Sequence, residues 1–186
     1  MKGSFKLGKI ADIGIFVHWT FSLLILFIIF INYRSGQSAT QIVWSVVFIL
    51  SIFITVVMHE LGHALAAKRY HIITKDITLL PIGGLARLEK IPEKPIEELI
   101  VAIAGPMVNI TLAFITGIFI TIPDTSEQLM AELSNGVNAH NFFLNFFLVN
   151  FWLALFNLIP AFPMDGGRIL RALLSFRMQR NIATRI

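Results

Sequence analysis

The chain has 186 residues, of which 56% are hydrophobic and 14% are charged, and its formal net charge is +4. Soluble domains have about 25% charged residues, so this composition, with a mean hydropathy of +0.77, excludes an ordinary water-soluble globule and a disordered chain. It predicts an all-α, polytopic membrane protein folded as one domain, residues 1–186. The sequence contains no cysteine, which excludes disulfides and thiolate metal sites.

Long apolar runs predict about four transmembrane helices, over residues 13–31, 42–67, 97–122 and 142–160. Residues 1–12 favour a short strand or an interfacial segment. The first run has about 19 residues, enough to cross a hydrocarbon core of about 30 Å. It lacks a small-residue cleavage site, so we expect a retained span rather than a signal peptide.

Residues 74–95, between the second and third runs, are apolar but too short to cross a membrane. Gly83-Gly84 indicates a turn, and residues with β propensity flank it. We therefore expect a small β-hairpin or re-entrant element. Non-helical backbone at membrane depth must line a cavity or be buried in protein.

The Lys and Arg residues lie at the ends of the apolar runs, which argues against nucleic acid as a partner. The N-terminus has three, and the connections after the first, second and third runs have one, six and none; the C-terminal segment has five. This alternation follows the positive-inside rule for a multi-pass protein in a lipid bilayer, with both termini in the cytoplasm.

The second run contains His59-Glu60-Leu61-Gly62-His63, an H-E-x-x-H motif. Residues four apart share one face of a helix, so His59 and His63 are expected to aim two imidazoles at one metal ion. Glu60 would lie beside that ion and accept a proton from a water molecule made acidic by it. The pattern predicts a zinc hydrolase in which Glu60 returns the proton to the leaving amine.

A catalytic zinc takes three protein ligands and keeps one position open. The candidates for the third ligand are Asp165, Glu60 itself and His18. Asp165 fits best, because it follows a helix that two prolines must break. The predicted topology also places Asp165 at the depth of the two histidines, near the cytoplasmic side.

Four signatures follow one another along the chain: His59-Glu60-Leu61-Gly62-His63; Pro81-Ile82-Gly83-Gly84; Ala104-Gly105-Pro106 with Asn109; and Asn157, Pro160, Pro163, Asp165, Gly166 and Gly167. In these residues the chain resembles the site-2 protease family of intramembrane zinc metalloproteases, of the archaeal and bacterial type related to peptidase family M50. The resemblance covers nearly the whole chain.

The resemblance implies a site with one Zn²⁺, held by His59, His63 and Asp165, with Glu60 as the catalytic acid and base. It implies a prokaryotic plasma-membrane endopeptidase that cleaves the transmembrane segments of membrane-tethered regulators, in regulated intramembrane proteolysis. Many members carry two further spans and a nucleotide-sensing CBS pair, which this chain is expected to lack.

The resemblance also implies that Asn109 and Asn157 lie near the site and position the substrate or an oxyanion. A helical substrate hides its peptide bonds and must unwind before attack. The element around residues 77–86, with Gly83 and Gly84, is therefore expected to offer a strand edge to an extended substrate.

Two other classes of function fit the same residues. A metal transporter or sensor would use His and Asp as a pathway, although a pathway needs ligands at several depths. An inactive scaffold would bind a partner helix through Gly105 and the Phe-rich fourth run.

Overall fold

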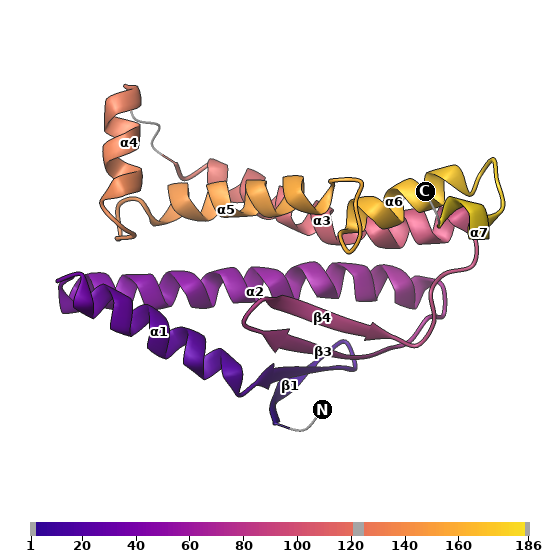
Figure 1. Ribbon diagram of the computed structural model, residues 1–186, viewed down its shortest axis with the longest axis horizontal. Coiled ribbons are helices and arrows are strands. Elements are labelled where there is room, and N and C mark those ends of the chain that lie inside the picture. The colour runs from indigo at the N-terminus through magenta and orange to yellow at the C-terminus, as the bar shows by residue number, and fades with distance from the viewer. Residues whose placement is uncertain (1–2, 121–124, 185–186) are drawn as a thin grey trace.

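The computed structural model describes residues 3–120 and 125–184. Its elements, in chain order, are β1 (Ser4–Ile10), β2 (Ile13–His18), α1 (Thr20–Arg34), α2 (Ala39–Arg69), β3 (Thr74–Leu80), β4 (Gly83–Leu88), α3 (Pro95–Gly117), α4 (Ser126–Ser134), α5 (Phe142–Asn157), α6 (Asp165–Leu174) and α7 (Arg180–Ala183). They form two layers: α1, α2 and the sheet lie in one, and α3, α5 and α6 lie in the other (Figure 1).

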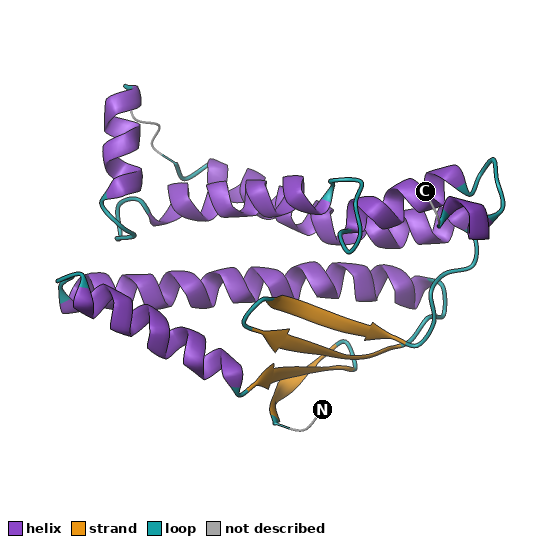
Figure 2. Cartoon of the chain, in the orientation of Figure 1, coloured by secondary structure: helices purple, strands orange, loops and turns teal. Residues whose placement is uncertain are grey.

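The strands form one sheet beside the C-terminal half of α2, in the order β1-β2-β3-β4 (Figure 2). The central pair, β2 and β3, is parallel, and both outer pairs are antiparallel. Ile13 and Ile77 pack with Leu61 and Ala64 of α2 into a buried cluster. This burial holds the sheet against the helix that carries the H-E-x-x-H motif.

The prediction of an all-α protein with four spanning helices is wrong. Residues 13–18 form β2, in which Gly14 to Val17 pair with Asp76 to Leu79 of β3. An apolar run rich in β-branched residues fits a buried strand as well as a helix, and periodicity alone cannot separate the two. The partner strand lies more than 50 residues away, so nothing local indicates it.

Among the described residues, two helices are long and apolar enough to cross a membrane by length and composition: α2 with 31 residues and α3 with 23. The helix in the first predicted span, α1, has 15 residues, and α5 in the fourth has 16. At 1.5 Å per residue these are about 22 and 24 Å long, short of a hydrocarbon core of about 30 Å. Residues 121–122 of the third predicted span lie outside the described residues.

In the segment for which the sequence predicts a hairpin, β3 and β4 pair antiparallel, with Leu80 opposite Gly83. An ion pair adds to the ladder: Arg87 Nε donates to Asp76 Oδ1 at 2.8 Å, and Nη2 bonds the other carboxylate oxygen. This hydrogen bonding holds the pKa of Asp76 below its usual value, so the carboxylate stays ionised at neutral pH and keeps β4 on β3.

The helices of the second layer are joined by a buried ion pair. Glu98, in the first turns of α3, is 1% exposed, and it accepts a hydrogen bond from Arg171 Nε of α6 at 2.9 Å and another from Nη2. The Arg171 guanidinium also lies over the Phe162 ring, 5.6 Å from its centroid. This pair ties α6, which begins with Asp165, to α3.

We expect Glu98→Ala to destabilise the folded protein by about 3–5 kcal/mol, because it leaves a buried guanidinium without its carboxylate. Unfolding in mild detergent micelles, followed by circular dichroism, measures the change. Glu97→Ala is the control: its partner Lys94 is 75% exposed at the side chain, and an exposed pair contributes about 0–1 kcal/mol. Equal losses for the two variants would contradict the assignment.

Candidate metal centre

The two motif histidines point from α2 toward α3 and are both buried. Their Nε2 atoms lie 3.1 Å apart, as the four-residue spacing on one helix face allows. α2 and α3 approach closely here: a Cβ on Gly62 would lie 2.8 Å from the Ala104 carbonyl oxygen. The close approach brings α3 backbone and side chains within reach of both imidazoles.

The outer nitrogen of each ring is held by α3. His63 Nδ1 lies 2.7 Å from the Val101 carbonyl oxygen, which only accepts, so Nδ1 carries the proton. His59 Nδ1 lies 2.9 Å from Asn109 Oδ1, and it donates to that oxygen in the same way. Both rings therefore turn Nε2, the nitrogen that α3 does not hold, toward the space between them, as metal-ligating histidines do.

Asp165 completes a triangle of acceptors. It is the first residue of α6, beyond the break that follows α5, and it is buried. Its Oδ2 lies 3.1 Å from His59 Nε2 and 3.0 Å from His63 Nε2. Within residues 3–120 and 125–184, these three residues are the one group of His, Asp and Glu side chains placed to hold a metal ion.

The donor set fits Zn²⁺. Two imidazole nitrogens and a carboxylate oxygen converge here with separations of 3.0–3.1 Å, and a metal cation between them would be bound by all three. Tetrahedral zinc bonds of about 2.0–2.1 Å place neighbouring donors about 3.3 Å apart. Three protein ligands of this kind with an open fourth position are the arrangement of catalytic zinc sites.

Gly105 of α3 makes room for this triangle. A Cβ on Gly105 would collide with His63 Nε2 and would lie 2.7 Å from His59 Nε2. Only hydrogen fits there, and this direct contact with the ligand atoms was not predicted from the sequence, in which Gly105 was proposed only as a contact for a partner helix. The Ala104-Gly105-Pro106 signature was the available signal.

Glu60 lies beside the triangle without belonging to it. It faces a cavity of about 470 Å³ that His59, His63 and Asp165 also line. Its side chain packs on Gly84 of β4, whose Cβ would be 2.8 Å from Glu60 Cγ. Among the described residues the Glu60 carboxylate accepts no hydrogen bond, so its lone pairs face the cavity.

The other predicted site residues also line this cavity: Gly83, Gly84, Asn109 and Asn157. Asn109 contacts His59, as described, whereas the Asn157 side chain donates to the Leu153 carbonyl one turn earlier, at 2.9 Å. His18, an alternative third ligand, is not brought to the site: its Nδ1 lies 2.7 Å from Thr20 Oγ1.

Two contributors were missed from the sequence. The Val101 carbonyl orients His63. A backbone carbonyl is present whatever the residue type, so the sequence cannot predict this contact. Arg168 lines the cavity, with Nη1 3.8 Å from Asp165 Oδ1. Its spacing of three from Asp165 on a helix was a readable signal.

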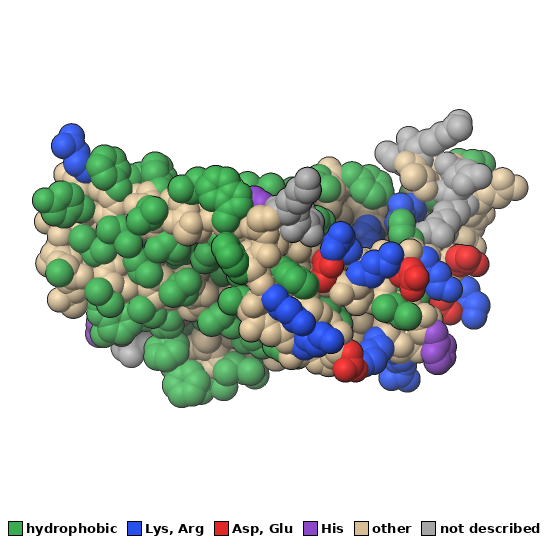
Figure 3. All heavy atoms as spheres, turned by 90° about the horizontal axis from the view of Figure 1, so that it is seen from below, with side chains coloured by type: hydrophobic (Ala, Val, Ile, Leu, Met, Phe, Trp, Pro, Cys, Tyr) green, Lys and Arg blue, Asp and Glu red, His purple; other side chains and the backbone are tan. Residues whose placement is uncertain are grey.

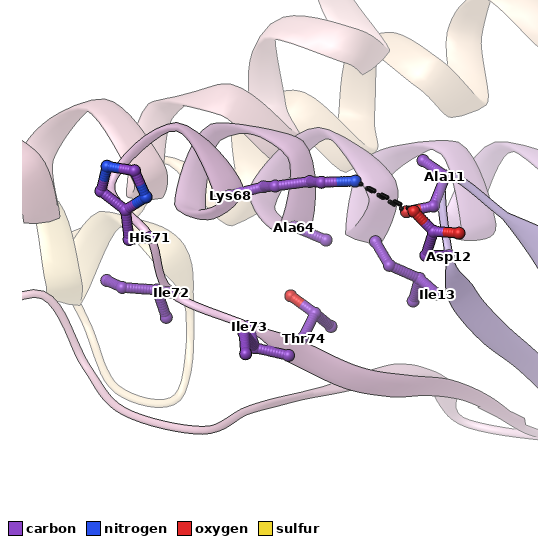
Figure 4. A pocket seen from close by; sticks show the side chains of 9 residues that line it. All are labelled: Ala11, Asp12, Ile13, Ala64, Lys68, His71, Ile72, Ile73 and Thr74. Atoms are coloured by element: carbon purple, nitrogen blue, oxygen red, sulfur yellow. Dashed lines mark hydrogen bonds and ion pairs between the residues drawn. The ribbon is translucent and has the colours of Figure 1, made fainter.

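A second cavity of about 470 Å³ lies against another face of the C-terminal end of α2 (Figure 4). Lys68 spans it and donates to the Ala11 carbonyl at 3.2 Å, next to Asp12. The two cavities have the same volume, so the converging donor atoms, and not the size, distinguish the metal centre.

Comparison with known proteins agrees with this chemistry. Residues 47–186 match peptidase family M50. A zinc metalloprotease of Methanocaldococcus jannaschii is 43% identical over 175 residues, which are 94% of this chain and 47% of that protein. Stage IV sporulation protein FB of Bacillus subtilis is 34% identical over 139 residues, 74% of this chain and 44% of that protein. The chain thus spans about half the length of these curated relatives.

A solved structure shares the fold. The site-2 protease from Methanocaldococcus jannaschii superposes with a TM-score of 0.66 and 38% identity, over 98% of this chain and 76% of that one. The family match covers most of the chain and includes both halves of the metal centre, His59 with His63 and Asp165. This chain is a member of peptidase family M50.

Proposed function

We propose that the chain is a zinc-dependent endopeptidase that hydrolyses peptide bonds within the transmembrane segments of membrane proteins. The observation that carries the proposal is the triangle formed by His59 Nε2, His63 Nε2 and Asp165 Oδ2, with edges of 3.0–3.1 Å, beside the Glu60 carboxylate in the same cavity. We also propose that residues 1–186 form one catalytic core.

In this proposal His59, His63 and Asp165 hold Zn²⁺, with Asn109 and the Val101 carbonyl fixing the two rings. Bound Zn²⁺ supplies Lewis acidity, which polarises the peptide carbonyl and makes water easier to deprotonate near neutral pH. Glu60 takes the proton from the attacking water and then delivers it to the nitrogen of the leaving amine. Its packing on Gly84 keeps its carboxylate aimed at the cavity.

We further propose that α2 and α3 cross the plasma membrane of a prokaryote, with the metal centre near the cytoplasmic side. Basic and acidic side chains gather at one end of the sheet face of the molecule, and the rest of that face is mostly hydrophobic (Figure 3). His63 precedes Lys68 by five residues, about 7–8 Å along the helix. The first and last described elements, β1 and α7, lie toward the end of the long axis of the molecule that carries the sheet (Figure 1), and we assign this end to the cytoplasm.

The substrate is proposed to bind as an extended strand along β4. β4 is one of the two edge strands of the sheet, and residues 82–86 line the cavity of the metal centre. Pairing with such an edge would satisfy the backbone of a substrate helix that has unwound at membrane depth. Membrane-tethered regulatory proteins, released by one cut in a single span, are the proposed substrate class.

We expect Gly84→Val to reduce cleavage at least about 100-fold with zinc retained. The Cβ of the new side chain would lie 2.8 Å from Glu60 and 2.9 Å from Val56. The valine would also narrow the cavity along β4, where the substrate is proposed to bind. A misplacement of about 1 Å is enough for an effect of this size. Gly8→Val in β1 is the control, because a Cβ there meets nothing within 4 Å. Unchanged cleavage by Gly84→Val with full zinc would remove support for this path.

The proposed function is tested with the purified chain and a single-span reporter substrate in mild detergent. We expect one zinc per chain, cleavage that stops when a chelator removes zinc, and recovery when zinc is restored. His63→Ala is expected to lose both zinc and cleavage. Cleavage that survives complete zinc removal, or a zinc-loaded chain that cleaves no membrane-spanning substrate, would overturn the proposal.

A further inference from the structure

Arg168 is a largely buried cation that the chemistry above does not use. Its side chain is 21% exposed and its one ion pair is distant, with Nη1 3.8 Å from Asp165 Oδ1. In the part of the chain that the structure describes, its guanidinium donates no hydrogen bond. A guanidinium has five N–H donors, and those of Arg168 are left without a hydrogen-bond acceptor beside the cavity of the metal centre, which Arg168 lines.

Arg171, on the same helix, has a guanidinium whose hydrogen-bond donors have partners. Arg171 donates from both Nε and Nη2 to Glu98 and lies over an aromatic ring. Burying an arginine without such partners is costly. The contrast indicates that the partner of Arg168 is a group that enters the cavity.

The position of Arg168 limits what that group is. Asp165 Oδ2 faces the two histidines, and Oδ1 faces Arg168, so the guanidinium lies next to the metal centre. Arg168 belongs to the layer of α3, α5 and α6, whereas β4 belongs to the layer of α2 (Figure 1). A strand bound along β4 has one edge paired with it, and the carbonyl groups of its other edge need donors.

We propose that Arg168 is a catalytic residue that donates hydrogen bonds to the carbonyl oxygen of the substrate's scissile peptide bond. The inference rests on the proposed function. In hydrolysis a C–O bond to water forms, the peptide C–N bond breaks, and a water proton passes through Glu60 to the leaving nitrogen. Arg168 transfers no proton; it stabilises the negative charge that builds on the carbonyl oxygen, as charge-assisted hydrogen bonds do.

The test compares Arg168→Gln, Arg168→Lys and Arg168→Ala with Arg177→Gln, an exposed arginine beyond α6. For each variant, metal analysis gives the zinc content, kinetics with the single-span reporter give kcat, and binding of the same reporter is measured in a Glu60→Gln background. Removing one donor to a developing oxyanion typically lowers kcat by about 100–1000-fold.

We expect Arg168→Gln to keep one zinc per chain, bind the reporter within about threefold of the parent, and lose kcat by that factor, with Arg168→Lys between the two. Added guanidinium ion should restore part of the cleavage by Arg168→Ala and leave Arg177→Gln unchanged.

Three results would overturn the inference. Loss of zinc from Arg168→Gln and Arg168→Lys would make Arg168 a support for Asp165, and weaker reporter binding at unchanged kcat would make it a substrate-binding group. A kcat within threefold of wild type would leave it without a role in the reaction. A zinc-loaded wild-type chain that cleaves no substrate refutes the proposed function itself, whereas equal cleavage by wild type and Arg168→Gln refutes only the role of Arg168.

Discussion

Replacing Glu60 by glutamine is expected to abolish cleavage while leaving the zinc site intact. The amide has the shape of the carboxylate but cannot take a proton from water, and loss of a general base typically costs about 10²–10⁴-fold in rate. Zinc should remain, because Glu60 is outside the group of three donors formed by His59, His63 and Asp165. Cleavage of the reporter and zinc content of the same preparation provide the two measurements.

The same variant separates the proposed peptidase from the two other classes. A metal transporter would carry zinc across vesicle membranes equally well as wild type and as Glu60→Gln, and neither would cleave the reporter. A scaffold would bind a partner helix equally in both forms. Glu97→Gln, in the first turn of α3 and paired with the exposed Lys94, controls for charge removal and should behave as wild type. Cleavage by Glu60→Gln at more than about a tenth of the wild-type rate would refute the assigned chemistry.

The metal centre was largely predictable because its strongest signal is local. His59, Glu60 and His63 occupy one turn of a helix, and the helical repeat alone places the two imidazoles together. Asp165 is 102 residues beyond His63, and only the broken helix and the expected depth pointed to it. These signals already favoured Asp165 over His18, which ends β2 in the structure and bonds Thr20.

The fold was predicted less well, because the prediction missed a pairing between strands that lie far apart in the sequence. The run that begins at Ile13 is apolar enough for a span, but its first six residues pair with β3. Such pairing depends on a strand beyond the whole of α2, and hydropathy carries no information about it. A similar limit applies to α6, which is held by the contact between Glu98 and Arg171 across 73 residues.

Arg168 and the Val101 carbonyl were missed for different reasons. A backbone carbonyl is present at every position, so only coordinates show that Val101 accepts from His63. Arg168 lies in a segment whose five basic residues fit the positive-inside rule. Because that rule accounted for all five together, no separate role for Arg168 was predicted. Burial of its side chain beside Asp165 distinguishes it from the exposed Arg177.

Gly105→Ala is expected to expel zinc and eliminate cleavage together. The added methyl group would collide with His63 Nε2 and lie 2.7 Å from His59 Nε2, so the two ligands must turn away. Loss of an outer-shell partner already costs 10–100-fold in metal affinity, and displacing the donor atoms themselves should exceed that. Zinc content after dialysis against a metal buffer of known free zinc measures the effect.

The helix itself should tolerate the change, which makes the result specific. Alanine favours a helix over glycine by about 0.5–1 kcal/mol, so a fall in zinc affinity cannot be attributed to a weaker α3. Gly117→Ala on the same helix is the control: its nearest neighbour would be a Phe147 ring atom at 3.6 Å, an ordinary contact, and zinc should stay bound. If Gly105→Ala retained zinc at wild-type affinity, Gly105 would only serve helix packing, and the donor triangle would have to lie elsewhere.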